Sequence, residues 1–193
     1  TEMTDAASYL YNQADVLGEP CVINASLGDY DGSHDGQDLQ ALMIDSMITA
    51  KPGRVFVAAS GNESNIPFHL GCSLTAGDTA FTWLAYYSSN GGIYFDAWAD
   101  TANFSKVQFS IGVDQTSPFK FRAQTAFSKV IANLGTVITD TLKNTAGDRL
   151  GIIQTYSQLV GKTYSLEVSI APDSTSYYWR FTTTGSGKFD CWY

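Results

Sequence analysis

The spacing of apolar residues changes character near residue 70. Before that point, apolar residues recur at helical spacing over 5–17 and over 37–50. Each of these segments is followed by a short, continuous apolar run, at 21–26 and 54–59. Continuous runs of this length are typical of strands buried on both faces of a parallel sheet. The first part of the chain therefore predicts a helix–strand–helix–strand order with a right-handed crossover between the two strands.

Beyond residue 70, short alternating runs replace the helical spacing. Turn sequences rich in Gly, Pro, Asn and Asp separate them, and the clearest runs are Phe81–Tyr87, Val107–Val113, Tyr164–Ile170 and Tyr177–Phe181. Period-two alternation with regular turns indicates an antiparallel β-sandwich, and roughly eight strands favour a jelly roll. We expect Trp83 and Trp179 in its core and Trp98 on its surface.

These patterns predict two domains of different fold class, α/β followed by all-β. Residues 1–68 form a partial parallel α/β sheet, and residues 69–193 form an inserted, jelly-roll-like β-sandwich. The α/β part has only two predicted strands, so its open edges invite further pairing or association.

Composition narrows the possible partners. The chain has 193 residues, of which 44% are hydrophobic, which is enough to build a core. Its net charge of −8 argues against nucleic acid and anionic membrane surfaces as partners. No apolar run approaches the roughly 20 residues of a membrane-spanning helix.

The three cysteines are widely spaced and odd in number, which does not suggest a metal site. Cys21 precedes a buried strand and is expected to be a core thiol. Cys72 and Cys191 bracket the second domain, whose ends lie close together if it is an insertion. A Cys72–Cys191 disulfide would join those ends, and the alternative is two unrelated reduced thiols.

Both predicted parallel strands end in small or polar residues. Ser26-Leu27-Gly28 follows the first strand, and Ser60-Gly61-Asn62 follows the second. Ligand sites of open α/β sheets form outside the carboxyl ends of the strands. We therefore expect these two segments to lie side by side at a site.

Together with the helix between them, the two segments resemble the middle of the catalytic domain of subtilisin-like serine proteases (subtilases). In that family a Ser-Leu-Gly strand end pairs with the substrate backbone, and the Asn of an Ala-Ala-Gly-Asn-Glu stretch donates to the oxyanion. The corresponding stretch here is Ala58-Ala59-Ser60-Gly61-Asn62-Glu63, with an extra Ser before the Gly. The resemblance covers about the first third of the chain.

The resemblance implies a role for each matching residue. Asn62 would donate to the oxyanion, Ser26, Leu27 and Gly28 would bind the substrate backbone, and Ala59, Ser60 and Gly61 would form one wall of the side-chain pocket. The alternatives are that Asn62 is an ordinary turn residue and that Gly28 marks an ordinary strand exit.

The catalytic triad of that family is not found in this sequence. Peptide hydrolysis of this kind needs a Ser nucleophile, a His base and an Asp that orients the base. The two histidines, His34 and His69, are not in a His-Gly-Thr context, and Gly135-Thr136 is followed by Val137 rather than by Ser. The resemblance therefore implies an internal fragment, inactive alone, of a secreted or cell-envelope endopeptidase that acts on peptide or protein substrates.

The loop 29–38 contains the acids Asp29, Asp31, Asp35 and Asp38. Oxygen-rich loops bind calcium, but Ser33 stands where an EF-hand has an acid or Asn, and no bidentate Glu follows at the required spacing. We expect no cofactor, with calcium at this loop as the alternative. His34 is expected to form hydrogen bonds within the loop, and Asp35 to begin the second helix favourably.

Two functions of other classes remain open from the sequence. In the first, the parent protein is catalytically dead and this region is a binding or scaffold module. In the second, the sandwich binds carbohydrate through an exposed Trp98.

Overall fold

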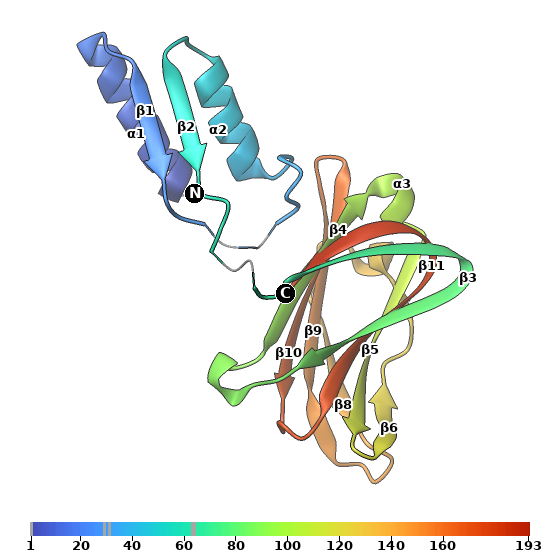
Figure 1. Ribbon diagram of the computed structural model, residues 1–193. Coiled ribbons are helices and arrows are strands. Elements are labelled where there is room, and N and C mark those ends of the chain that lie inside the picture. Colours follow the sequence, from blue (N-terminus) through green and yellow to red (C-terminus); the bar gives the residue numbers. More distant parts are fainter. Residues whose placement is uncertain (1, 29, 31, 63–64) are drawn as a thin grey trace. The chain divides into compact units, whose positions relative to one another are not determined.

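A computed structural model of the chain describes residues 2–28, 30, 32–62 and 65–193. The chain divides into two compact units, Thr1–Pro67 and Phe68–Tyr193 (Figure 1).

The first unit alternates helices and strands as the sequence predicted. Its elements are α1 (Glu2–Leu17), β1 (Cys21–Ala25), α2 (Leu39–Thr49) and β2 (Arg54–Ala58). The two strands pair in parallel, with Cys21 opposite Arg54 and Ala25 opposite Ala58. The predicted helix–strand–helix–strand order is therefore confirmed.

The start of α2 differs from the expectation. Asp38, and not Asp35, is the N-cap of this helix, because its carboxylate accepts a hydrogen bond from Ala41 N at 2.8 Å. Asp35 instead accepts hydrogen bonds within the preceding loop, from Gln37 N at 2.9 Å and from the Ser33 hydroxyl.

A cluster around Tyr11 joins the helices to the strands. The buried Tyr11 donates its hydroxyl hydrogen to Val55 O at 3.0 Å, and the Arg54 guanidinium lies 5.1 Å from the centre of the Tyr11 ring. Arg54 also binds Asp15 of α1 at 2.7 Å and Met47 O of α2 at 2.9 Å. These contacts hold α1, α2 and β2 together.

The opposite face of the β1–β2 sheet is left uncovered. Val22 is 68% exposed and pairs with Val55, which is also exposed, as is Val57 on the same face. The sheet has the two parallel strands that the sequence predicted, and a sheet of this size does not establish a subtilisin-like α/β fold.

The second unit is an antiparallel β structure, as predicted. Its strands are β3 (His69–Ala85), β4 (Ile93–Asp100), β5 (Val107–Thr116), β6 (Phe119–Gln124), β7 (Ser128–Lys129), β8 (Ile138–Lys143), β9 (Arg149–Val160), β10 (Thr163–Pro172) and β11 (Tyr178–Trp192). Three short helical segments connect them: η1 (Ser88–Asn90), α3 (Thr101–Phe104) and η2 (Val130–Asn133).

These strands form one continuous sheet, so the predicted two-sheet jelly roll is wrong. The order is β6-β5-β11-β4-β10-β9-β8, with β3 beside β11 and β7 beside β5. One edge of β11 pairs with β3 along nearly its whole length. The other edge pairs first with β5, over Tyr178–Gly185, and then with β4, over Asp190–Trp192. Because β11 belongs to both halves, the sheet curls around its core instead of separating into two sheets (Figure 1).

A glycine-containing irregularity lets β11 change partners. The register of β11 against β3 shifts between Gly185 and Gly187, whose φ values are 112° and 144°. A Cβ at Gly187 would lie 2.6 Å from Asn103 O of α3. Both the backbone conformation and the close approach therefore require glycine here.

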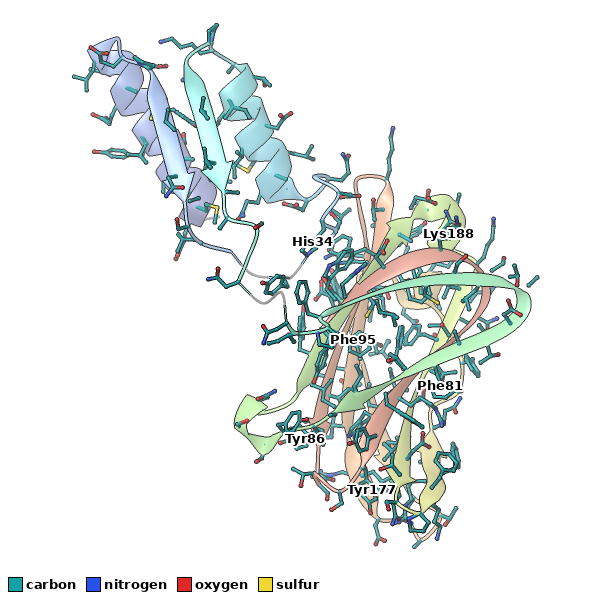
Figure 2. The ribbon with its side chains drawn as sticks, viewed as in Figure 1. His34, Phe81, Tyr86, Phe95, Tyr177 and Lys188 are labelled. Atoms are coloured by element: carbon teal, nitrogen blue, oxygen red, sulfur yellow. The ribbon has the colours of Figure 1, made fainter. Side chains whose placement is uncertain are left out.

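The core of this unit lies inside the curl. Phe95 of β4 and Phe181 of β11 have ring centres 4.9 Å apart, whereas Phe81 points outward from β3 (Figure 2). Trp179 is 1% exposed, which confirms its predicted core position. The predictions for the other two tryptophans are wrong, because Trp83 is 44% exposed and Trp98 is 8% exposed.

The predicted Cys72–Cys191 disulfide is not formed, since Cys72 and Cys191 are free thiols. In the β3–β11 register Cys191 lies opposite Leu70, and Cys72 lies opposite Phe189. The two cysteines are thus diagonal neighbours, for which Cα separations of about 7–8 Å are typical. A disulfide needs Cβ atoms about 3.5–4.5 Å apart, so this register does not favour it.

Candidate functional site

The two strand exits of the first unit leave the same edge of the sheet. Ala25 and Ala58 are paired at the carboxyl ends of β1 and β2, and Ala59 N donates to Ala25 O at 3.1 Å just beyond them. The segments 26–28 and 59–62 therefore start side by side, and all their side chains are exposed. Such an edge offers unpaired backbone groups to an extended peptide.

Asn62 lies at the end of the second exit. It follows Gly61, whose φ of 92° turns the chain away from the direction of β2. The Asn62 side chain is exposed and forms no hydrogen bond with any described residue, so its amide is free to donate to a ligand. Glu63, the next residue of the motif, lies outside the described residues.

Tyr30 is a residue of this site that the sequence analysis missed. Its side chain packs on Gly61, where an added Cβ would come within 2.9 Å of Tyr30 Cζ. Tyr30 stands in a polar loop, and nothing in the sequence pattern connects it with Gly61. The only local sequence signal for this contact was Gly61 itself. Its positive φ and the close approach of the Tyr30 ring both favour glycine at this position.

The loop that contains His34 is organised by hydrogen bonds of its own. The His34 Nε2 atom lies 2.8 Å from Tyr30 O, and the His34 backbone has a φ of 50°. No group of three His, Cys, Asp or Glu side chains that could hold a metal ion occurs in 2–28, 30, 32–62 or 65–193. Asp29 and Asp31 of the calcium alternative lie outside the described residues, so that alternative stays a prediction.

His69 lies in the second unit and forms half of a triad-like pair. Its Nε2 atom lies 2.9 Å from Asp190 Oδ1, and its ring centre is 5.0 Å from that of Trp192. Both side chains of this pair are about half exposed, and no Ser, Thr or Cys of the fully described range 68–193 hydrogen-bonds to the ring. The pair links β3 to β11 on the surface of the unit.

The strand exits present groups that can bind a ligand. Exposed backbone at Ser26–Gly28 can pair with a peptide, and the Asn62 amide can donate to a carbonyl oxygen or oxyanion. None of the described helices combines the length and apolar character needed to span a bilayer.

Comparison with known proteins shows a shared fold. No family model and no curated protein sequence matches the chain. Among solved structures, the chain is similar to the CspB protease of Clostridium perfringens, with a TM-score of 0.74 and 22% sequence identity. The match covers 98% of this chain and 39% of that protein.

These findings correct the family assignment that the motifs suggested. The identification of the chain as an internal fragment of a subtilisin-like catalytic domain is wrong: the likeness to a protease of that kind is 22% identity over 39% of its length, and no family model matches the chain. At 22% identity the likeness to the CspB protease establishes similarity of fold and no more.

Proposed function

We propose that this chain is part of a larger peptidase and contributes substrate binding and oxyanion stabilisation, while the attacking group comes from elsewhere. Ser26, Leu27 and Gly28 pair with the backbone of an extended substrate. Asn62 donates its side-chain amide to the oxyanion, and Ala59, Ser60 and Gly61 form one wall of the pocket for the substrate side chain. Residues 69–193 are an inserted β domain in this proposal.

The observation that supports this proposal most is the pairing of the two strand exits. Ala25 and Ala58 end their strands level with each other, so a peptide that pairs with Ser26–Gly28 passes near the segment that ends at Asn62. The uncovered face of the β1–β2 sheet, with Val22 and Val57 exposed, is consistent with further covering structure in a larger protein. The match to 39% of the CspB protease points in the same direction.

The test is the hydrolysis of a fluorogenic peptide by the longer protein, with and without Asn62→Ala. Removal of one oxyanion donor typically lowers kcat by about 10²–10³, and a donor that acts only in the transition state leaves KM nearly unchanged. The matched control is Asn65→Ala, the same substitution three residues further along the same connection. A kcat of Asn62→Ala equal to that of Asn65→Ala would contradict the proposal.

The 193 residues alone are expected to bind peptide and not to hydrolyse it. The lack of a triad motif in the sequence also supports a second candidate, a peptide-binding or scaffold module whose parent has no peptidase activity. The two candidates differ in the longer protein, where only the first predicts turnover. The carbohydrate-binding hypothesis has lost its basis, because Trp98 is buried and its indole N–H donates to Asp96 at 2.6 Å.

A further inference from the structure

The second unit contains a cavity of about 490 Å³ at the open seam of its curled sheet. On one side of the cavity lie β5 and β7, and on the other lie β8 and β9. Strand β8 ends the sheet and pairs only with β9. The segment that follows β7 and η2 crosses to β9, where Gly135 N donates to Ser157 O at 2.7 Å. This volume falls within the range of about 300–1,000 Å³ found for small-molecule sites.

The cavity has an apolar floor and a neutral polar rim. The floor consists of buried side chains from both halves of the sheet, namely Phe109, Ile111, Val130, Leu142 and Ile153. The rim consists of hydroxyl and amide side chains, among them Thr125, Ser128, Asn133, Thr155 and Ser157. A ligand would thus place an apolar body on the floor and polar groups at the mouth.

Asp140 introduces a negative charge into this lining. It stands on the same face of β8 as Ile138 and Leu142, opposite Ile153 of β9, and it lines the cavity. Lys129 also lines the cavity, but it alternates with Ser128 on β7, and Ser128 is the residue paired with the inward-facing Phe109. By this alternation the Lys129 side chain leaves the strand on the outer side.

Asp140 also differs from the other acidic residues of its unit. Residues 68–193, all of them described, contain nine acidic side chains. Eight of these hold a hydrogen bond or an ion pair, such as Asp114 with Arg180 and Asp173 with Arg149. Asp140 holds neither within the described residues, and its side chain is exposed at the mouth of the cavity that it lines.

An inward-pointing charge on an edge strand can serve simply to prevent pairing with another sheet. At this position, however, the carboxylate faces a space large enough for a ligand, above an apolar floor. We propose that the cavity binds an organic cation, an ammonium or guanidinium group attached to an apolar body. The cation pairs with Asp140, and the body lies against Ile111 and Ile153.

Two sources of this cation share the same chemistry, a free amine and a Lys or Arg side chain of a polypeptide. Residues 68–193 contain nine acidic and nine basic side chains, so no general negative charge of the unit would attract cations. Selectivity for a cation therefore depends on Asp140 itself. This inference is independent of the peptidase proposal, because it uses only residues of the second unit.

The test is a titration of the 193-residue chain with hexylammonium and with 1-hexanol, followed by amide chemical shifts. The apolar bodies are matched, and only the charge differs. We expect saturable shifts in β8 and β9 with hexylammonium, and binding of hexanol weaker by about tenfold or more, the value of a charge-assisted contact. Equal binding of the two probes, or no saturable shift with either, would overturn the proposal.

A variant pair assigns the effect to one carboxylate. Asp140→Asn is expected to abolish the preference for hexylammonium, whereas Asp45→Asn, the same change at an exposed position of α2, leaves it intact. Unchanged circular dichroism of Asp140→Asn shows that the variant is folded. A folded Asp140→Asn variant that still prefers the cation would contradict the proposal. If the unmodified chain binds neither probe and the Asp140→Asn variant aggregates, Asp140 serves only to prevent pairing of the edge strand with another sheet. An N-acetyl-lysyl peptide that binds the site more tightly than hexylammonium would support a polypeptide as the source of the cation. Tighter binding of hexylammonium would support a free amine.

Discussion

The Asn62 side-chain amide is available to a ligand, and it directly follows a turn made by Gly61. Gly61 turns the chain at a φ of 92°, and Tyr30 packs against it. The Asn62 side chain that follows is exposed and has no hydrogen-bond partner among the described residues. A donor in this state can respond to charge that develops on a ligand, because it need not first break a bond of its own. Single residues thus determine what the strand exits can do chemically.

Cys191 gives a prediction at the same scale. Burial, together with nearby Asp96 and Cys72, raises the pKa of the Cys191 thiol to about 12 from its usual 9.0. The folded chain should therefore leave Cys191 unalkylated by iodoacetamide at pH 8, as mass spectrometry would show, and unfolding in urea should expose it. Equal labelling rates in the native and unfolded chain would contradict this environment.

The same shift predicts a loss of stability in alkaline solution. Above pH 9 the unfolded thiol releases its proton while the folded thiol retains it, so the unfolded state binds fewer protons. The contribution of Cys191 is fully present below pH 9 and declines as the pH rises toward 12. A Cys191→Ala variant should lose this part of the pH dependence in urea titrations.

At the scale of elements, a buried ion pair holds the outer face of β3, β5 and β11 together. Asp114 is 0% exposed, and its Oδ2 atom accepts from Arg180 at 2.6 Å and from the Trp83 indole at 2.9 Å. The Arg180 guanidinium also lies 5.5 Å from the centre of the Phe121 ring. These contacts explain why Trp83 stays on the outer face although it is aromatic.

Arg180→Ala should therefore be among the most destabilising substitutions on this face. It leaves the Asp114 carboxylate buried without its ion-pair partner, a change that typically costs about 3–5 kcal/mol of unfolding free energy. The matched control is Arg149→Ala, which breaks an exposed ion pair with Asp173 and should cost about 0–1 kcal/mol. Urea unfolding measures the loss of unfolding free energy in both variants. Equal losses would show that water reaches the Asp114 carboxylate.

The elements were predictable from sequence where the pattern is local. Helical spacing over 5–17 and the apolar run at 21–26 involve neighbours in the chain, so α1 and β1 followed from them. Alternation shows which residues share a face, but not which face is inward. Phe81 and Trp83 are in phase, as predicted, yet they lie on the outer face, whereas Leu84, on the other face of β3, enters the core.

At the scale of the whole chain, the two units differ in how much they bury. The hydrophobic core cluster runs from Leu74 to Cys191, entirely within the second unit. Among the described residues of the first unit, the buried apolar side chains are Ala7, Tyr11 and Ala25. The single curled sheet was not predictable, because it depends on β11 pairing with β3, β4 and β5, which are distant in sequence. The cavity at its seam depends on the same long-range pairing.

This difference predicts unequal folding of the two units when they are separated. Residues 68–193 should fold alone, with dispersed amide resonances and a cooperative melting transition, because their core is complete. Residues 1–67 should not, since one face of their two-stranded sheet is bare and both strands are edge strands. Dispersed amide resonances for residues 1–67, together with poorly dispersed resonances for residues 68–193, would contradict this difference in stability between the units.

The central claim is that the exits of β1 and β2 form one peptide-binding edge. Its most direct test is a titration of the 193-residue chain with an extended peptide, following backbone amides and the Asn62 side-chain amide by NMR. The account predicts that saturable shifts concentrate at Ser26–Gly28 and at the Asn62 side chain. Shifts confined to other parts of the chain, with both segments unaffected at saturation, would contradict it.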